Sequence, residues 1–127
     1  MLDIEKLTSL NGVSGNEDSV RKEILKMTEK YADDITVDSM GSIIAFKKGK
    51  NPNGKKIIFS AHMDEVGFII SDITDDGYLK FKTVGGIDDR ILLGQNVLVQ
   101  QEWRSPAERQ RCIAKFPYRN LLTSSAA

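Results

Sequence analysis

Cysteine and histidine are nearly absent from this sequence, which has only Cys112 and His62 among its 127 residues. A single cysteine excludes a disulfide within the chain, so we expect a cytoplasmic protein. Cys112 has no histidine near it in sequence, and we assign it no catalytic role. A single histidine cannot complete a four-ligand zinc site, even with one or two carboxylates beside it.

An excess of charge and long apolar runs are also missing. Lys and Arg number 18, as do Asp and Glu, so the chain has no electrostatic footprint for nucleic acid or for an acidic membrane surface. No apolar stretch approaches the length of a membrane span, and the N-terminus lacks the apolar core of a signal peptide. With 40% apolar and 28% charged residues, the composition is that of a soluble globular protein.

The N-terminal quarter predicts two helices. Residues 2–10 form a short helix that ends at the pair Asn11-Gly12. Ser14 and Glu17 then match a capping box, in which the Ser14 hydroxyl accepts a hydrogen bond from an amide of the next helix and Glu17 reaches back. That helix is expected to run to about residue 32, with an apolar stripe formed by Val20, Ile24, Met27 and Tyr31.

Strand patterns follow the second helix. Residues 35–38 and 42–46 predict two strands joined around Gly41. Residues 56–61 predict a third strand, whose continuously apolar core Ile57-Ile58-Phe59 is typical of a strand covered on both faces in an α/β sheet. Ligands in such sheets gather at the carboxyl ends of the strands.

The pattern from residue 67 onward is purely β. Strands over 68–73 and 78–84 flank an Asp-Gly turn, which is a strong hairpin signal, and residues 91–100 predict one more strand. The fold class is therefore α/β, with a boundary between two folding units near residue 67.

Residues 101–127 form an atypical tail, which is rich in Arg and holds the only Trp and the only Cys. It is either a polar surface helix with a loose end or the product of a slipped coding frame. Reading residues 102–106 one base later gives Asn or Ser, then Gly, and with suitable codons Glu-Val-Pro, which is a hairpin turn entering a strand. Resequencing the gene across the codons of residues 100–106 decides between the two.

The main chemical signal is His62 with Asp64 and Glu65, directly after the predicted strand 56–61. An imidazole is a common metal ligand, and a nearby carboxylate often orients it. His62 and Asp64 lie two apart on an extended stretch and could both face one cleft. The alternative is a hydrogen-bonded histidine at a strand end. We expect Glu65 to be solvated.

The residues around His62 and Asp64 resemble a known family motif. Residues 61–68, Ala-His-Met-Asp-Glu-Val-Gly-Phe, closely resemble the motif of the M42 metallo-aminopeptidases, the glutamyl and deblocking aminopeptidases, of which CelM-type members carry an endoglucanase label. Residues 12–17 and 84–95 look like two further segments of the same family. Together the resemblance extends over residues 1 to about 100.

This resemblance implies a domain assignment and roles for two residues. Residues 1–66 would be the N-terminal portion of a mixed-sheet zinc-peptidase catalytic domain, and residues 67–100 the first strands of an inserted β-barrel domain. His62 would bind one metal of a two-metal site, with zinc or cobalt as the ions, and Asp64 would be the catalytic carboxylate that orients the site. The other ligands and the general base would lie in sequence that this chain lacks.

The resemblance also implies partners and one structural cluster. The parent enzyme would act on the N-termini of peptides and form a homo-oligomer, and this N-terminal piece by itself is expected to be inactive. Asp88, Asp89 and Arg90 correspond to a barrel loop in the family, so we expect them to be structural.

Two other function classes remain open. The chain could be a non-catalytic binding or assembly module that uses the exposed edge of its partial barrel, and a defined oligomer in size-exclusion chromatography would favour this. An endoglucanase would need a pair of placed carboxylates across a sugar cleft, and the sequence singles out no such pair.

Overall fold

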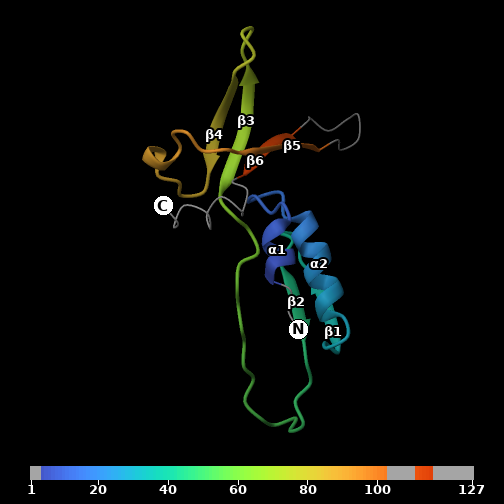
Figure 1. The fold of residues 1–127 in the computed structure, drawn as a ribbon. Helices are drawn as coiled ribbons and strands as arrows, with labels where there is room; N and C mark the ends of the chain where they lie inside the picture. The colour runs from blue at the N-terminus through green and yellow to red at the C-terminus, as the bar shows by residue number, and fades with distance from the viewer. Residues whose placement is uncertain (1–3, 103–110, 116–127) are drawn as a thin grey trace.

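The computed structural model describes residues 4–102 and 111–115, and its elements form a helical part and two antiparallel sheets (Figure 1). The helices are α1 (Ile4–Ser9), α2 (Asp18–Thr28) and the short 3-10 helix η1 (Asp89–Ile91). The strands are β1 (Asp34–Val37), β2 (Ile43–Phe46), β3 (Gly67–Ile73), β4 (Leu79–Val84), β5 (Leu98–Glu102) and β6 (Arg111–Lys115). The α/β class expected from the sequence is confirmed.

Helix α2 forms where its apolar stripe predicts, but the capping box is wrong. The helix begins at Asp18 with no side-chain cap, because the Ser14 hydroxyl donates to Asp64 instead of serving the helix start. The Glu17 carboxylate does reach back, to the amide of Gly15 at 2.6 Å. Val20 is buried as expected, whereas Tyr31 lies exposed beyond the end of the helix at Thr28.

The first predicted strand pair is confirmed as the β1–β2 hairpin. The strands are antiparallel, with Asp34 opposite Phe46, and the turn passes through Gly41 at φ of 87°. The Asp38 carboxylate fixes this turn by accepting hydrogen bonds from the amides of Met40 at 2.9 Å and Ser42 at 2.8 Å. These bonds hold the pKa of Asp38 below its usual value, with the Ser42 amide as the largest cause.

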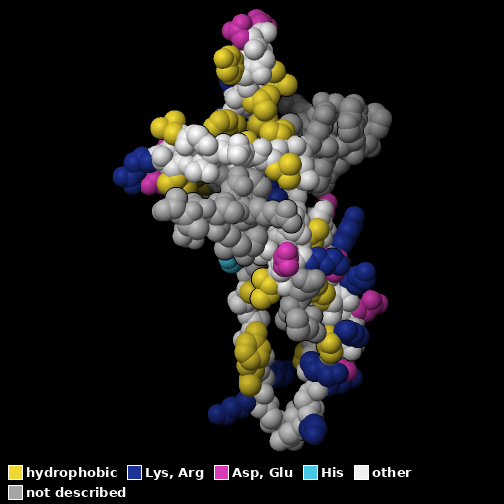
Figure 2. All heavy atoms as spheres, in the orientation of Figure 1, with side chains coloured by type: hydrophobic (Ala, Val, Ile, Leu, Met, Phe, Trp, Pro, Cys, Tyr) yellow, Lys and Arg dark blue, Asp and Glu magenta, His cyan; other side chains and the backbone are white. Residues whose placement is uncertain are grey.

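The predicted strand over residues 56–61 is wrong. This stretch is extended but joins no sheet, and the β1–β2 sheet has only those two strands within the described residues. Ile58 and Phe59 are 90% and 93% exposed. Figure 1 shows the segment as an open arm below the helices, and Figure 2 shows exposed hydrophobic side chains along it. A strand needs backbone partners on a neighbouring strand, and the described part of the chain supplies none here.

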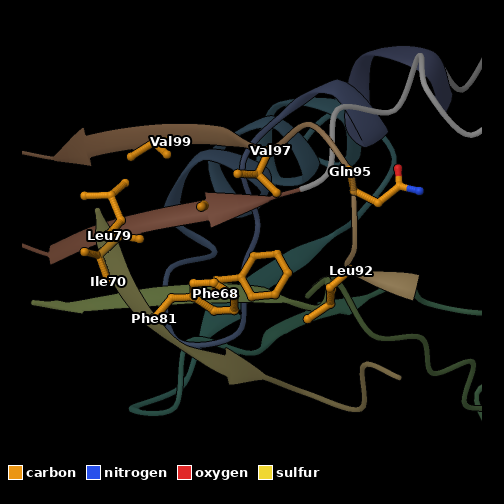
Figure 3. Close-up of a pocket in the computed structure, with 9 residues that line it drawn as sticks. Phe68, Ile70, Leu79, Phe81, Leu92, Gln95, Val97 and Val99 are labelled. Atoms are coloured by element: carbon orange, nitrogen blue, oxygen red, sulfur yellow. The ribbon is translucent and has the colours of Figure 1, made fainter. Parts of the chain in front are cut away.

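The second predicted hairpin is confirmed and forms the centre of a larger sheet. Strands β3 and β4 join through Gly77, at φ of 84°, and the sheet order is β4-β3-β6-β5. Phe68 packs edge-to-face on Phe81, with 4.9 Å between the ring centres. These rings and Leu92 line an apolar hollow of about 190 Å³ (Figure 3), where the side chain of Gln95 points away from the rings.

Two expectations about the C-terminal part need correction. The strand predicted over 91–100 begins only at Leu98, because η1 extends to Ile91 and is followed by a turn in which Gly94 has φ of 76° and the Gln95 amide donates to Leu92 O at 3.2 Å. Residues 111–115 of the atypical tail form strand β6 between β3 and β5 and not a surface helix. The rest of the tail, residues 103–110 and 116–127, lies outside the described residues.

The buried apolar core of the described residues is small. It comprises Val13 and Val20 in the helical part and Phe68 and Ala114 in the four-stranded sheet. None of the described helices combines the length and the apolar character that crossing a membrane would require.

Candidate functional site

His62 and Asp64 lie side by side on the extended segment that leads from the arm to β3. Nδ1 of His62 is 3.0 Å from the backbone oxygen of Asp64 and 3.1 Å from Oδ1 of its carboxylate. Because both neighbours are hydrogen-bond acceptors, this geometry favours the tautomer with the proton on Nδ1. Nε2 then carries the lone pair, on a side chain that is 86% exposed.

Ser14 completes this group from a loop far away in sequence. Its hydroxyl donates to Oδ2 of Asp64 at 2.8 Å. This hydrogen bond is the largest cause that holds the pKa of Asp64 below its usual value, and the His62 ring acts in the same direction. Asp64 is therefore a carboxylate with each oxygen on a different partner, Oδ1 on His62 and Oδ2 on Ser14.

Glu65 is not solvated as the sequence analysis expected. Its backbone pairs with the loop before α2: Glu65 N–H donates to Gly12 O at 2.8 Å, and Ser14 N–H donates to Glu65 O at 3.2 Å. Its carboxylate accepts from Gly12 N–H at 2.9 Å and from the Lys115 ammonium at 3.1 Å. Lys115 is buried and also donates to the backbone oxygens of Ser9 and Leu10. Glu65 thus fixes the backbone on which Ser14 and Asp64 meet.

A hollow of about 220 Å³ opens beside His62, between the start of α2 and the β1–β2 turn. It is lined by Glu17, Arg21 and residues 40–43 and 61–64. Arg21 holds the two sides together, because its Nε donates to Gly41 O at 2.7 Å while its guanidinium pairs with Asp18. The hollow is polar enough to admit water or a polar ligand next to the imidazole.

The residues present fit one ligand position of a metal site with its supporting carboxylate. An exposed imidazole nitrogen, with the other ring nitrogen held by a carboxylate, is the usual arrangement of a metal-binding histidine. Within residues 4–102 and 111–115, however, no group of three or more His, Cys, Asp or Glu side chains could hold a metal ion. A complete coordination sphere would need donors from elsewhere.

The structure brings together His62 and Asp64, which the sequence singled out, and leaves the other charged cluster apart. Asp88 and Arg90 pair with each other on η1, where the guanidinium lies 2.6 Å from Oδ2 of Asp88 and lowers the pKa of that carboxyl. The sequence analysis missed the bond from Ser14 to Asp64. The available signal was that residues 12–17, which include Ser14, resemble a segment of the same family as the His-Met-Asp segment.

Comparisons with known proteins agree with the motif. The M42 glutamyl aminopeptidase family model matches residues 41–107, more than half of the chain. A relative from Acetivibrio thermocellus that is named as an aminopeptidase is 45% identical over 94 residues, covering 74% of this chain and 28% of the relative. This chain therefore spans little more than a quarter of the length of that relative.

Two solved structures have a similar fold. The Thermotoga maritima endoglucanase structure aligns with a TM-score of 0.72 and 40% identity, over 88% of this chain and 38% of that one. PhTET1-12s, described as a dodecamer in the asymmetric unit, aligns with a TM-score of 0.64 and 44% identity, over 78% of this chain and 30% of that one. Because the family model matches more than half of this chain, the chain belongs to the M42 glutamyl aminopeptidase family.

Proposed function

We propose that this chain carries one corner of the active site of a metal-dependent aminopeptidase, with His62 as a metal ligand and Asp64 as the carboxylate that orients it. The observation that carries the proposal is the contact of His62 Nδ1 with the carbonyl and carboxylate oxygens of Asp64, which leaves Nε2 to the solvent. Membership of the M42 family supports the reaction class.

The chain's own residues would prepare the ligand and hold it in place. Asp64, ionised over a wide pH range because of its lowered pKa, keeps the His62 proton on Nδ1 and the lone pair on Nε2. A bound pair of divalent ions, zinc or cobalt, would supply polarisation of the scissile carbonyl and a hydroxide nucleophile near neutral pH. Of that complete site, the described residues contribute His62 as ligand and Asp64 as its support.

The wider setting follows from the family and from the composition. The substrates would be peptides with a free N-terminus, and the complete enzyme would be a homo-oligomer, for which the dodecameric PhTET1-12s gives a precedent. One cysteine in 127 residues and a balance of charges favour a cytoplasmic protein that binds neither nucleic acid nor membranes.

A glycosidase is less well supported, although one structural neighbour is called an endoglucanase. Glycoside hydrolysis needs a carboxylic acid whose pKa is raised, so that it can protonate the leaving group. Asp64 is a carboxylate that lines the hollow, and its pKa is lowered and not raised.

A chimera tests the proposal without requiring activity from the chain alone. The 94 matching residues of this chain replace their counterparts in the Acetivibrio thermocellus relative, and hydrolysis of an aminoacyl chromogenic amide is measured with zinc or cobalt. We expect activity that a chelator removes and that His62→Ala lowers by at least ~100-fold. A folded, metal-loaded chimera that cleaves carboxymethylcellulose but no peptide would contradict the proposal.

The unmodified 127-residue chain serves as the second arm of this experiment. We expect it to hydrolyse no peptide with either metal, because one histidine cannot hold a metal pair. Turnover by this chain that His62→Ala abolishes would show that its site is more complete than we propose.

A further inference from the structure

We propose that Ser14 is a positioning residue for the metal-binding histidine: its hydroxyl holds the Asp64 carboxylate in the orientation that keeps the His62 proton on Nδ1. This inference rests on the proposed function, because it concerns how that ligand is presented. It adds a residue from the loop before α2, which lies 50 positions away from Asp64 in sequence.

The three side chains form one chain of hydrogen bonds. Ser14 Oγ donates to Asp64 Oδ2 at 2.8 Å, and Asp64 Oδ1 lies 3.1 Å from His62 Nδ1. A hydroxyl that donates to a carboxylate makes a charge-assisted bond, which is stronger than a bond between neutral groups. Fixing one carboxylate oxygen also fixes the other, because both belong to one planar group.

Packing covers little of the His62 ring, so its polar contacts with Asp64 orient it. The His62 side chain is 86% exposed and that of Asp64 is 40% exposed. Without the hydroxyl of Ser14, the carboxylate gains freedom to rotate into solvent. The His62 ring would then keep only the backbone oxygen of Asp64, at 3.0 Å, as the acceptor for its Nδ1 proton.

Ser14 itself is held firmly. Val13, its neighbour in the chain, is 1% exposed and pairs with Glu65 as an isolated parallel bridge. The amide of Ser14 donates to the carbonyl oxygen of Glu65, directly after Asp64 in the chain. The loop and the His-Met-Asp segment are thus joined by backbone hydrogen bonds, and the Ser14–Asp64 contact is built on that frame.

The tautomer of His62 provides the test, and the chain is well suited to it because this is its only histidine. Nitrogen-15 NMR of the metal-free chain at about pH 9, where imidazoles are neutral, gives the ratio of the two neutral tautomers from a single ring. The matched variants are Ser14→Thr, which keeps the hydroxyl, and Ser14→Val, which replaces it with a methyl group of similar size. Asp64→Ala sets the ratio without the carboxylate, and Ser71→Ala is a control on β3.

We expect Ser14→Val to shift the tautomer ratio away from Nδ1–H by about five-fold, the equivalent of one ordinary hydrogen bond, toward the Asp64→Ala value. Ser14→Thr and Ser71→Ala should keep the ratio of the unmodified chain. Backbone amide spectra check that each variant is folded; if Ser14→Val is not, Ser14→Ala replaces it. A ratio in the hydroxyl-free variant equal to that of the unmodified chain would overturn the proposal.

Failure of this inference would be distinct from failure of the proposed function. The tautomer is measured without metal, whereas the proposed function depends on the chimera's activity and on His62→Ala. An unchanged tautomer would leave Ser14 as a turn residue alone, with the aminopeptidase proposal still standing on its own experiment.

Discussion

Two apolar segments of this chain end in opposite environments. Residues 57–59 lie on an open arm, where Phe59 is 93% exposed, whereas Phe68 in β3 is 3% exposed in the four-stranded sheet. The difference lies in where each segment finds its partner. Strand β3 pairs with β4 across a short turn that its own sequence encodes, while the arm pairs with no strand among the described residues.

The difference between the arm and β3 shows that apolar character alone does not make a strand. A hairpin brings its partner within a few residues, so local turn chemistry is sufficient. A strand that is covered on both faces depends on neighbours and helices from distant parts of the sequence. The arm has the sequence of such a strand without such neighbours in the described residues.

The largest expected effect is the difference in stability between the alanine variants of Phe68 and Phe59. Phe68→Ala removes a buried ring and its edge-to-face contact with Phe81, so we expect the free energy of unfolding to fall by about 3–5 kcal/mol. Phe59→Ala removes a ring that is already in water, so the change should stay within about 0.5 kcal/mol. Urea denaturation followed by circular dichroism measures both. Equal losses would show that the arm packs in solution, and the contrast between the arm and β3 would then be wrong.

A smaller difference in stability is expected between the methionine variants of Lys115 and Lys80. Lys115 is 6% exposed and donates to Glu65 and to two backbone oxygens, so Lys115→Met removes a buried ammonium group and its bonds to three part-buried acceptors and should cost about 2 kcal/mol. Lys80 pairs with Asp72 on the surface, and Lys80→Met should change stability by less than about 0.5 kcal/mol. The same denaturation experiment applies.

The lysine pair also tests how strongly β6 is attached to the rest of the protein. If Lys115→Met were as mild as Lys80→Met, the contact from β6 to Glu65 would not contribute to stability. The loop before α2 would then be held by its other contacts, which are the backbone pairing with Glu65, the bond from the Gly12 amide to the Glu65 carboxylate and the bond from Ser14 to Asp64.

The smallest effect concerns acid stability at the β1–β2 turn. The amides of Ser42 and Met40 lower the pKa of Asp38, so its contribution is present above the pKa of the unfolded chain and is lost as the pH falls through the lower folded value. Asp38→Asn should therefore flatten the loss of stability between about pH 5 and pH 2. Asp38→Glu keeps the charge but misplaces the oxygens, and should flatten it as well. Denaturation midpoints measured at several pH values would contradict this if both variants followed the parent curve.

Hairpins and helix positions could be predicted from sequence because their signals are local. Gly41 and Gly77 mark the two hairpin turns, and both take the positive φ that such turns require. The start of α2 could not be predicted correctly, because Ser14 had a tertiary partner in Asp64 that competed with helix capping. The absence of a strand at 56–61 depends on non-local pairing, which the apolar pattern does not report.

The candidate site divides in the same way. His62 and Asp64 are close in sequence, so their contact could be expected, and the structure places them within 3.1 Å. The roles of Glu65 and Lys115 could not, because they arise from a contact between residues 50 positions apart. The domain boundaries and the slipped reading frame remain predictions, and resequencing across residues 100–106 still decides the second.

Nitrogen-15 NMR of the 127-residue chain during a zinc titration tests most directly whether His62 binds metal through Nε2. We predict that the Nε2 resonance of His62 shifts as zinc is added while Nδ1 stays protonated, with weak affinity because the site has one ligand. A chelator should reverse the shift. If zinc bound without moving the Nε2 resonance, or bound as well to His62→Gln as to the unmodified chain, His62 would not be the metal ligand that we propose.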